Sequence, residues 1–182
     1  MKALVINGSG RKDGFTSRAC ASFAEGLEAG GVECDIIFPY GMDIGHCNGC
    51  GKCRDGKCVI SDDMDSIYAM FEECDILALA SPIHFSGPSS IIKTVLDRFQ
   101  PYWYKKHENN GYAVGLLCGG GTEPAFGHTV SIFKAFTITT GYDWQGYLAI
   151  SGTDFHDPED SAMPSFNFGK SLASKISKGS PK

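Results

Sequence analysis

The sequence lacks the features that would place it in a membrane or on nucleic acid. None of its apolar runs approaches the ~18 residues that a membrane-spanning helix needs. Only Lys2 precedes the first apolar run, so there is no secretory signal peptide with a cleavage site. No run of basic residues offsets the formal net charge of -5 over 182 residues, which argues against non-specific binding to nucleic acid. We therefore expect a soluble, cytoplasmic protein with neither a membrane nor a nucleic acid as partner.

Two common nucleotide-binding motifs are also missing. The glycines after the apolar run Ala3–Asn7 fall as G-x-G-x-x-x-G, one residue longer than the dinucleotide fingerprint, and no Gly-Lys-Ser/Thr closes the loop as in the Walker motif. The loop 8–17, GSGRKDGFTS, instead combines glycines with hydroxyls and two cations. Its N–H groups and the start of the following helix would point at an anion. It predicts a cradle for a terminal monophosphate such as that of FMN; a glycine-rich turn without a ligand is the alternative.

Cysteine is well represented, with eight residues. Four of them, Cys47, Cys50, Cys53 and Cys58, lie in the segment 39–61, which has no helical or strand periodicity. Their spacing can surround a [4Fe-4S] cube, whose irons each take one thiolate. A structural zinc usually separates its Cys-x-x-Cys pairs by a longer stretch, and a loop without metal is a third interpretation. The other four cysteines, at helix and strand positions, are expected to be small apolar residues: Cys20, Cys34, Cys74 and Cys118.

Apolar periodicity predicts an alternation of strands and helices. The expected strands are 3–7, 32–38, 76–80, 112–118 and 144–150. Helices are expected to begin at Thr16, after a cap at Asp62 or Ser61, at Pro88, at Gly127 and at Ser165. This alternation predicts an α/β fold: a doubly wound, five-stranded parallel sheet with helices on both faces, in a single domain over 1–182. In the strand order 2-1-3-4-5, the loops 8–17, 81–87 and 118–122 converge at one edge.

Two further segments have a plain interpretation beside a functional one. Tyr102, Trp103 and Tyr104 could cover a ligand or form a subunit contact; the alternative is one ring in the core and the others exposed. The acidic stretch 154–160 resembles a metal site, but Pro158 and the missing periodicity favour a solvated loop.

Three motifs together resemble the NAD(P)H-dependent FMN reductase and iron-sulfur flavoprotein group of flavodoxin-like proteins. They are the loop 8–17, the four-cysteine cluster running into Asp62-Asp63-Met64, and Ser81-Pro82-Ile83-His84-Phe85. The motifs cover roughly the first hundred residues, and the remainder resembles the group in topology only. Two positions depart from the group: Gly10 stands where proline is often found, and His84 where tyrosine is common.

The resemblance implies a bound FMN and the residues that hold it. The phosphate would lie on Ser9, Arg11, Thr16 and Ser17. The isoalloxazine ring would lie against two segments, which are Pro82, Ile83, His84, Phe85 and Ser86, and Gly119, Gly120 and Gly121. The cluster ligands would be Cys47, Cys50, Cys53 and Cys58.

The resemblance also implies an oxidoreductase in which NAD(P)H is the substrate. Hydride would pass from NAD(P)H to the flavin without a catalytic side chain, and a cluster would direct single electrons to a redox protein such as ferredoxin. Related proteins assemble as homodimers or homotetramers. The alternative function is a flavodoxin-like electron carrier that does not itself oxidise NAD(P)H.

Overall fold

The computed structural model describes residues 1–105 and 110–179. Its parallel strands follow the order β2-β1-β3-β5-β6, with bounds β1 Lys2–Asn7, β2 Glu33–Ile37, β3 Ile76–His84, β5 Tyr112–Cys118 and β6 Asp143–Ile150. The two-residue β4, Gly87–Pro88, pairs antiparallel with the end of β3. Because β4 adds only this short hairpin, the predicted order of the parallel strands is confirmed, and the fold is flavodoxin-like.

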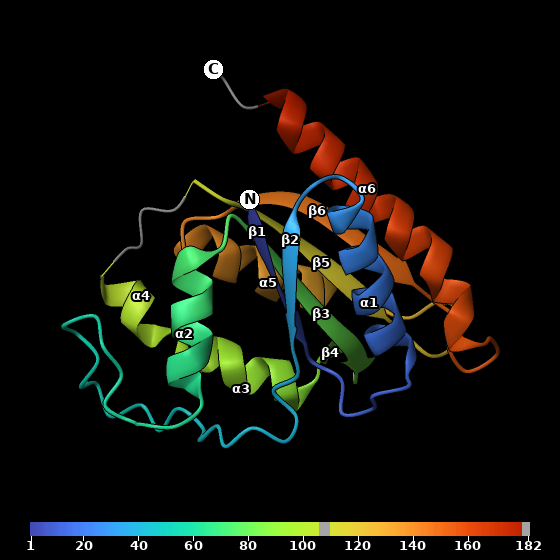
Figure 1. Cartoon of the computed structure of the whole chain (residues 1–182). Coiled ribbons are helices and arrows are strands. Elements are labelled where there is room, and N and C mark those ends of the chain that lie inside the picture. The colour runs from blue at the N-terminus through green and yellow to red at the C-terminus, as the bar shows by residue number, and fades with distance from the viewer. Residues whose placement is uncertain (106–109, 180–182) are drawn as a thin grey trace.

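Helices cover both faces of the sheet (Figure 1). One face carries α1, Phe15–Glu28, and α6, Ala162–Gly179; the other carries α2, Met64–Glu73, α3, Ser90–Arg98, α4, Gln100–Tyr104, and α5, Gly127–Thr139. Successive strand residues point to opposite faces, so Leu4 and Ile6 pack toward α2 and α3 while Ala3 and Val5 pack toward α1 and α6. Within the part of the chain that is described, no helix combines the length and apolar character that a bilayer span needs.

The backbones of α1 and α6 touch at two glycines. A Cβ on Gly26 would lie 2.2 Å from the carbonyl oxygen of Phe166, and one on Gly169 would lie 2.3 Å from that of Phe23. No other residue has room at either crossing point. This contact fixes α1 on the sheet, and with it the end of the loop 8–17 that leads into the helix.

The region after β3 differs from the sequence prediction in two ways. Ser81–His84 continue β3 because β5 extends far enough to pair Pro82 with Cys118, whereas a loop was predicted from Ser81. Pro88 is not the first residue of a helix: it pairs with Ile83 in β4, and its fixed φ suits this extended position. Helix α3 begins two residues later, where the hydroxyl of Ser89 accepts a hydrogen bond from the N–H of Ile92.

Candidate functional site

The loops after β1 and β3 are joined by direct hydrogen bonds at the carboxyl edge of the sheet. The Gly8 N–H donates to the Ala80 carbonyl at 2.8 Å, and the Ser89 hydroxyl donates to the Gly8 carbonyl at 2.6 Å. A Cβ on Gly8 would lie 2.7 Å from both the Ala80 oxygen and the Ile92 Cβ, so the position accepts only glycine. The loop 8–17 thus begins against β3 and the start of α3, at the two residues that flank the segment 81–88.

A buried asparagine organises the loop 8–17 from within. The Asn7 amide nitrogen donates to the Ser17 hydroxyl and its oxygen accepts from the Ser9 N–H, both at 2.9 Å. The Ser17 hydroxyl in turn donates to the Arg11 carbonyl at 2.6 Å. The sequence analysis missed Asn7, although a polar residue that ends an apolar run was a visible signal. The loop conformation is therefore fixed by its own hydrogen bonds.

The start of α1 is open to an anion. Its N-cap is Gly14, in an extended conformation, and no side chain caps the helix. The first N–H groups of a helix have no partner inside it, and they carry the positive end of the helix dipole. Ser9, Thr16 and Ser17 lie almost buried around this end, and Arg11 is exposed. The first N–H groups of α1 and the exposed Arg11 guanidinium are donors of the kind that a phosphate takes, whereas the Ser9 and Ser17 hydroxyls donate to the Arg11 carbonyl within the loop.

The segment predicted to hold the ring forms a tight hairpin. His84 pairs with Gly87, and the two residues between them, Phe85 and Ser86, have φ of 48° and 64°. Two successive positive φ values are typical of a type I′ turn, which glycine and asparagine favour. Phe85 is fully exposed, His84 is exposed, and Pro82 and Ile83 are half-buried. The hairpin therefore presents an apolar ring to solvent at some cost in backbone strain.

The glycine segment after β5 is tied to the loop that follows β6. The Gly121 N–H donates to the Asp154 carboxylate at 3.0 Å, and the Gly121 carbonyl accepts from the Gly152 N–H at 2.7 Å. A Cβ on Gly120 would lie 2.5 Å from the same carboxylate. Asp154 is thus a supporting residue of the predicted ring site, a role that the sequence analysis missed. Gly119 follows Cys118, whose buried thiol is hydrogen bonded to Thr16.

The other acidic residues of the stretch 154–160 have structural partners. Asp157 caps the 3-10 helix η1, Pro158–Ser161, and Glu159 forms an ion pair with Arg18 at 2.6 Å. Among the residues described, no three His, Cys, Asp or Glu side chains gather closely enough to hold one metal ion.

The four cysteines of the segment 39–61 line one cavity of about 330 Å³, next to residues of α3 and α4. Cys47 and Cys50 are exposed, and Cys53 and Cys58 are half-buried. A single zinc ion would need four sulfurs only about 3.8 Å apart, given its Zn–S bonds of about 2.3 Å. The sulfurs do not converge in that way. A cube takes one thiolate for each of its four irons, and the four cysteines that line the cavity are donors of that type and number.

The remaining cysteines and the aromatic segment follow the plainer predictions. Burial raises the pKa of Cys74 and of Cys118 to about 11, and that of half-buried Cys34 to about 12, as expected for packed thiols. Tyr102 is buried among aromatic rings, whereas Trp103 and Tyr104 are exposed. Tyr104 lines the cysteine cavity.

Comparison with known proteins shows which family the chain is similar to in sequence. The family model for NADPH-dependent FMN reductases matches residues 1–154. An iron-sulfur flavoprotein of Archaeoglobus fulgidus is 33% identical over 147 residues, which cover 78% of this chain and 67% of that protein. One of Methanocaldococcus jannaschii is 32% identical over 128 residues, 68% of this chain and 66% of that protein. Thus the matches span about two thirds of the length of these relatives.

A solved structure shares the fold. The FMN-dependent NADH-azoreductase from Bacillus anthracis, in complex with FMN, superposes with a TM-score of 0.69 over 97% of this chain and 99% of that one. The two sequences are 15% identical, so the likeness concerns the fold.

Proposed function

Because the chain belongs to the NADPH-dependent FMN reductase family, we propose that it is a flavin oxidoreductase that takes electrons from NAD(P)H. FMN, held by the loop 8–17 and its neighbours, and a [4Fe-4S] cluster, held by the cysteine segment, would supply the redox chemistry that delivers these electrons to an acceptor. When bound, FMN supplies the chemistry of accepting a hydride and releasing its electrons one or two at a time. The observation that supports the proposal is the loop 8–17, which its own hydrogen bonds fix at the uncapped start of α1, at the switch point of a flavodoxin-like sheet.

In this proposal the chain binds and orients the flavin. Ser9, Thr16, Ser17 and the first N–H groups of α1 bind the FMN phosphate, and Arg11 adds a positive charge. The hairpin Pro82–Ser86 and the glycines 119–121, which continue the paired strands β3 and β5, would contact the ring. Hydride transfer needs no acid or base from the protein, so we assign no catalytic side chain.

The cysteine segment extends the proposal to a cluster. Cys47, Cys50, Cys53 and Cys58 supply four thiols around one cavity, and the two relatives above are named iron-sulfur flavoproteins. Positive φ at Gly49, Gly51 and Gly56 shows that the segment already turns tightly between its cysteines. A cluster would direct single electrons to a redox protein such as a ferredoxin. Assembly into a homodimer or homotetramer stays a prediction from the family resemblance.

The first experiment is a visible spectrum, with flavin, iron and acid-labile sulfide assays, on protein purified without oxygen. We expect about one FMN and about four irons per chain. Cys50→Ala should lose the iron and keep the flavin. Cys34→Ala, which removes a cysteine outside the segment, should keep both. Flavin without iron or sulfide would contradict the cluster and leave a simple flavin reductase.

A second experiment separates the enzyme from the carrier. Oxidation of NADPH and of NADH is followed at 340 nm with a dye or ferredoxin as acceptor. Turnover with either nucleotide supports the enzyme. A flavin-loaded protein that oxidises neither would favour the flavodoxin-like carrier, and a protein that retains no added FMN would overturn both.

A further inference from the structure

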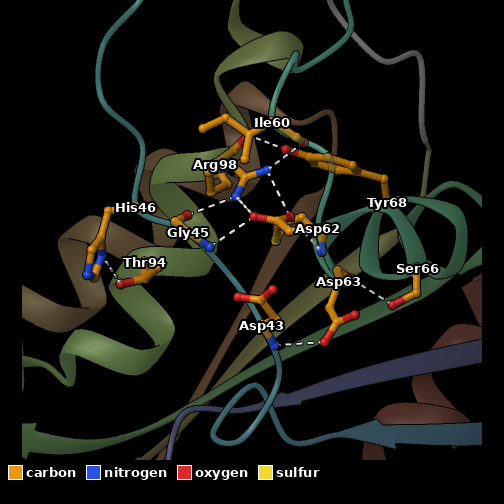
Figure 2. Close-up of polar contacts among 11 residues, drawn as sticks. Asp43, Gly45, His46, Ile60, Asp62, Asp63, Ser66, Tyr68, Thr94 and Arg98 are labelled. Atoms are coloured by element: carbon orange, nitrogen blue, oxygen red, sulfur yellow. Dashed lines mark hydrogen bonds and ion pairs between the residues drawn. The ribbon is translucent and has the colours of Figure 1, made fainter.

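The segment that carries the four cysteines is closed at its base. The Asp43 N–H donates to the Asp63 carboxylate at 2.7 Å, and the Asp63 N–H donates to the Asp43 carbonyl at 2.9 Å. Next to this pair, the Gly45 N–H donates to the Asp62 carboxylate at 2.9 Å (Figure 2). The two ends of the segment therefore lie side by side, and we call residues 43–45 and 60–63 the neck of the cysteine loop.

One side chain from α3 binds both arms of the neck. Figure 2 shows the Arg98 guanidinium between them. Its Nη1 donates to the Gly45 carbonyl at 2.8 Å and to the Asp62 carboxylate at 2.5 Å. Its Nη2 donates to the other Asp62 oxygen at 3.1 Å and to the Ile60 carbonyl at 3.2 Å. Cys47 lies two residues after Gly45 and Cys58 two residues before Ile60, so Arg98 sits where the first and last cysteines enter the loop.

Burying the Arg98 guanidinium costs free energy, and the residues of the neck accept hydrogen bonds from only some of its N–H groups. The Arg98 side chain is 0% exposed and that of Asp62 is 6% exposed. Burial acts to lower the pKa of Arg98, but hydrogen bonds to Asp62 and to the Cys58 thiol outweigh it, so the group stays charged. Its Nε is buried without a hydrogen-bond partner among the residues described. Arg98 also lines the cavity that the four cysteines share.

A neck held together for structural reasons alone would not need a further buried N–H donor on the wall of a thiol-lined cavity. Removing a charged donor from water without a partner costs free energy, and Arg98 lines the same cavity as the four cysteines. Donors that bond to thiolate or sulfide stabilise added negative charge on a cluster. The geometry thus relates Arg98 to the group that the cysteines would hold.

We propose that Arg98 is a positioning residue of the cysteine loop: it closes the neck through Gly45, Ile60 and Asp62, and its buried cation beside Cys58 raises the reduction potential of the cluster. The second half rests on the cluster assigned under the proposed function. Reduction adds one negative charge to a cluster, so a nearby cation favours the reduced form. Removing Arg98 should lower the potential, and removing its counter-ion Asp62 should raise it.

The neck is tested on FMN-loaded protein from which iron has been removed, so the result does not depend on the cluster. Hydrogen exchange is measured at the amides of Gly45 and Met64, both of which donate to Asp62. Arg98→Met should speed exchange at both amides at least tenfold. The control Lys93→Met removes one positive charge from the same helix, where Lys93 forms an exposed pair with Asp97, and should leave both rates unchanged. Unchanged rates in Arg98→Met would overturn the positioning role.

The electrostatic role is tested by redox titration of the cluster-loaded protein. Arg98→Met should shift the reduction equilibrium at least tenfold toward the oxidised cluster, which is about 59 mV for one electron. Asp62→Asn should shift it in the opposite direction, and Lys93→Met should leave it unchanged. Equal potentials in Arg98→Met and Lys93→Met, or shifts of the same sign in Arg98→Met and Asp62→Asn, would overturn the role.

Two further outcomes keep the proposals separate. If Arg98→Met loses its iron while it retains FMN, the positioning role is supported, and Arg98→Lys, which keeps the charge but loses the planar fork, is used for the titration. If the wild type itself takes up no iron or sulfide, the cluster and the electrostatic role both fail. The exchange rates at Gly45 and Met64 then test only whether Arg98 holds the neck closed.

Discussion

The loop 8–17 and the cysteine loop differ in how much of each site exists before a ligand arrives. In the loop 8–17, the serine and threonine hydroxyls are nearly buried, and the Asn7 side chain hydrogen-bonds to the loop. Gly8 is in close contact with β3 and α3. In the cysteine loop, the hydrogen bonds gather at the neck, and Cys47 and Cys50 are exposed at the end of it. The conformation of the first site is thus prearranged by the chain's own hydrogen bonds, whereas the second, in the function proposed above, would be completed by the metal that its thiols bind.

The largest effect is expected where the prearranged site has no spare room. Gly8→Ala would place a methyl group against the Ala80 carbonyl oxygen, which is backbone and cannot move aside. We expect a loss of about 3 kcal/mol in the free energy of unfolding and at least about a hundredfold weaker FMN binding. Urea unfolding and flavin fluorescence titration measure the two quantities.

Gly127→Ala is the matched control, because a Cβ at Gly127 meets nothing within 4 Å. It should leave FMN binding unchanged and alter the free energy of unfolding by no more than about 1 kcal/mol. If Gly8→Ala behaved like this control, the loop would be adaptable, and its contrast with the cysteine loop would disappear.

A smaller effect on the free energy of unfolding is expected from protonation of Asp62 in the neck at low pH. Burial acts to raise the pKa of Asp62, but hydrogen bonds from Arg98, Gly45 and Met64 outweigh it, so the folded value lies below the ordinary 3.8. A carboxyl with a lowered pKa contributes stability that is present above its unfolded pKa and is lost as pH falls through the folded one. At pH 7 the wild type should exceed Asp62→Asn by about 2 kcal/mol in free energy of unfolding.

This difference is measured by urea unfolding at several pH values. It should stay constant from pH 7 to about pH 5 and shrink below about pH 4, because the wild-type carboxyl then takes up a proton. A difference that does not change down to pH 3 would show that Asp62 acts by shape and not by charge.

The contrast between the two loops also explains how far sequence reasoning could go. The strand order follows from apolar runs such as 3–7 and 76–80, which short-range patterns reveal directly. The anion cradle at the loop 8–17 could be proposed because glycine and hydroxyl spacing is local, and it stays a prediction. Asn7 and Asp154 were missed because their roles depend on partners that tertiary folding brings together: Ser17 in the next helix and Gly121 in another loop.

Arg98 and Asp62 show the same limit more strongly. Nothing in a helix that ends in Leu-Asp-Arg marks the arginine as buried, since most arginines at helix ends stay in water. The sequence predicted only that Asp62 or Ser61 caps α2, whereas the N-cap is Asp63. The Asp62 side chain does accept the Met64 N–H at 3.0 Å, but it also binds Arg98 across 36 positions. Similarly, β4 is too short for any periodicity to show, so Pro88 was predicted to begin a helix.

The smallest expected effect concerns the hairpin beside the prearranged site, where stability and binding should oppose each other. Phe85 has a positive φ and is fully exposed, so its ring contributes no packing to the chain while its backbone is strained. Asparagine tolerates this conformation, so Phe85→Asn should raise the free energy of unfolding by about 0.5 to 1 kcal/mol. If the ring instead serves the flavin, the same variant should bind FMN several-fold more weakly.

Phe155→Asn is the control, because Phe155 is also exposed but does not have a positive φ. It should change neither quantity. A gain in stability with unchanged FMN affinity would mean that Phe85 does not touch the flavin, and an exposed aromatic ring on a strained turn would then have to serve another contact, such as a second subunit. A loss of stability would show that the turn is not strained, and the hairpin would join the loop 8–17 as a part of the site whose conformation the sequence itself prefers.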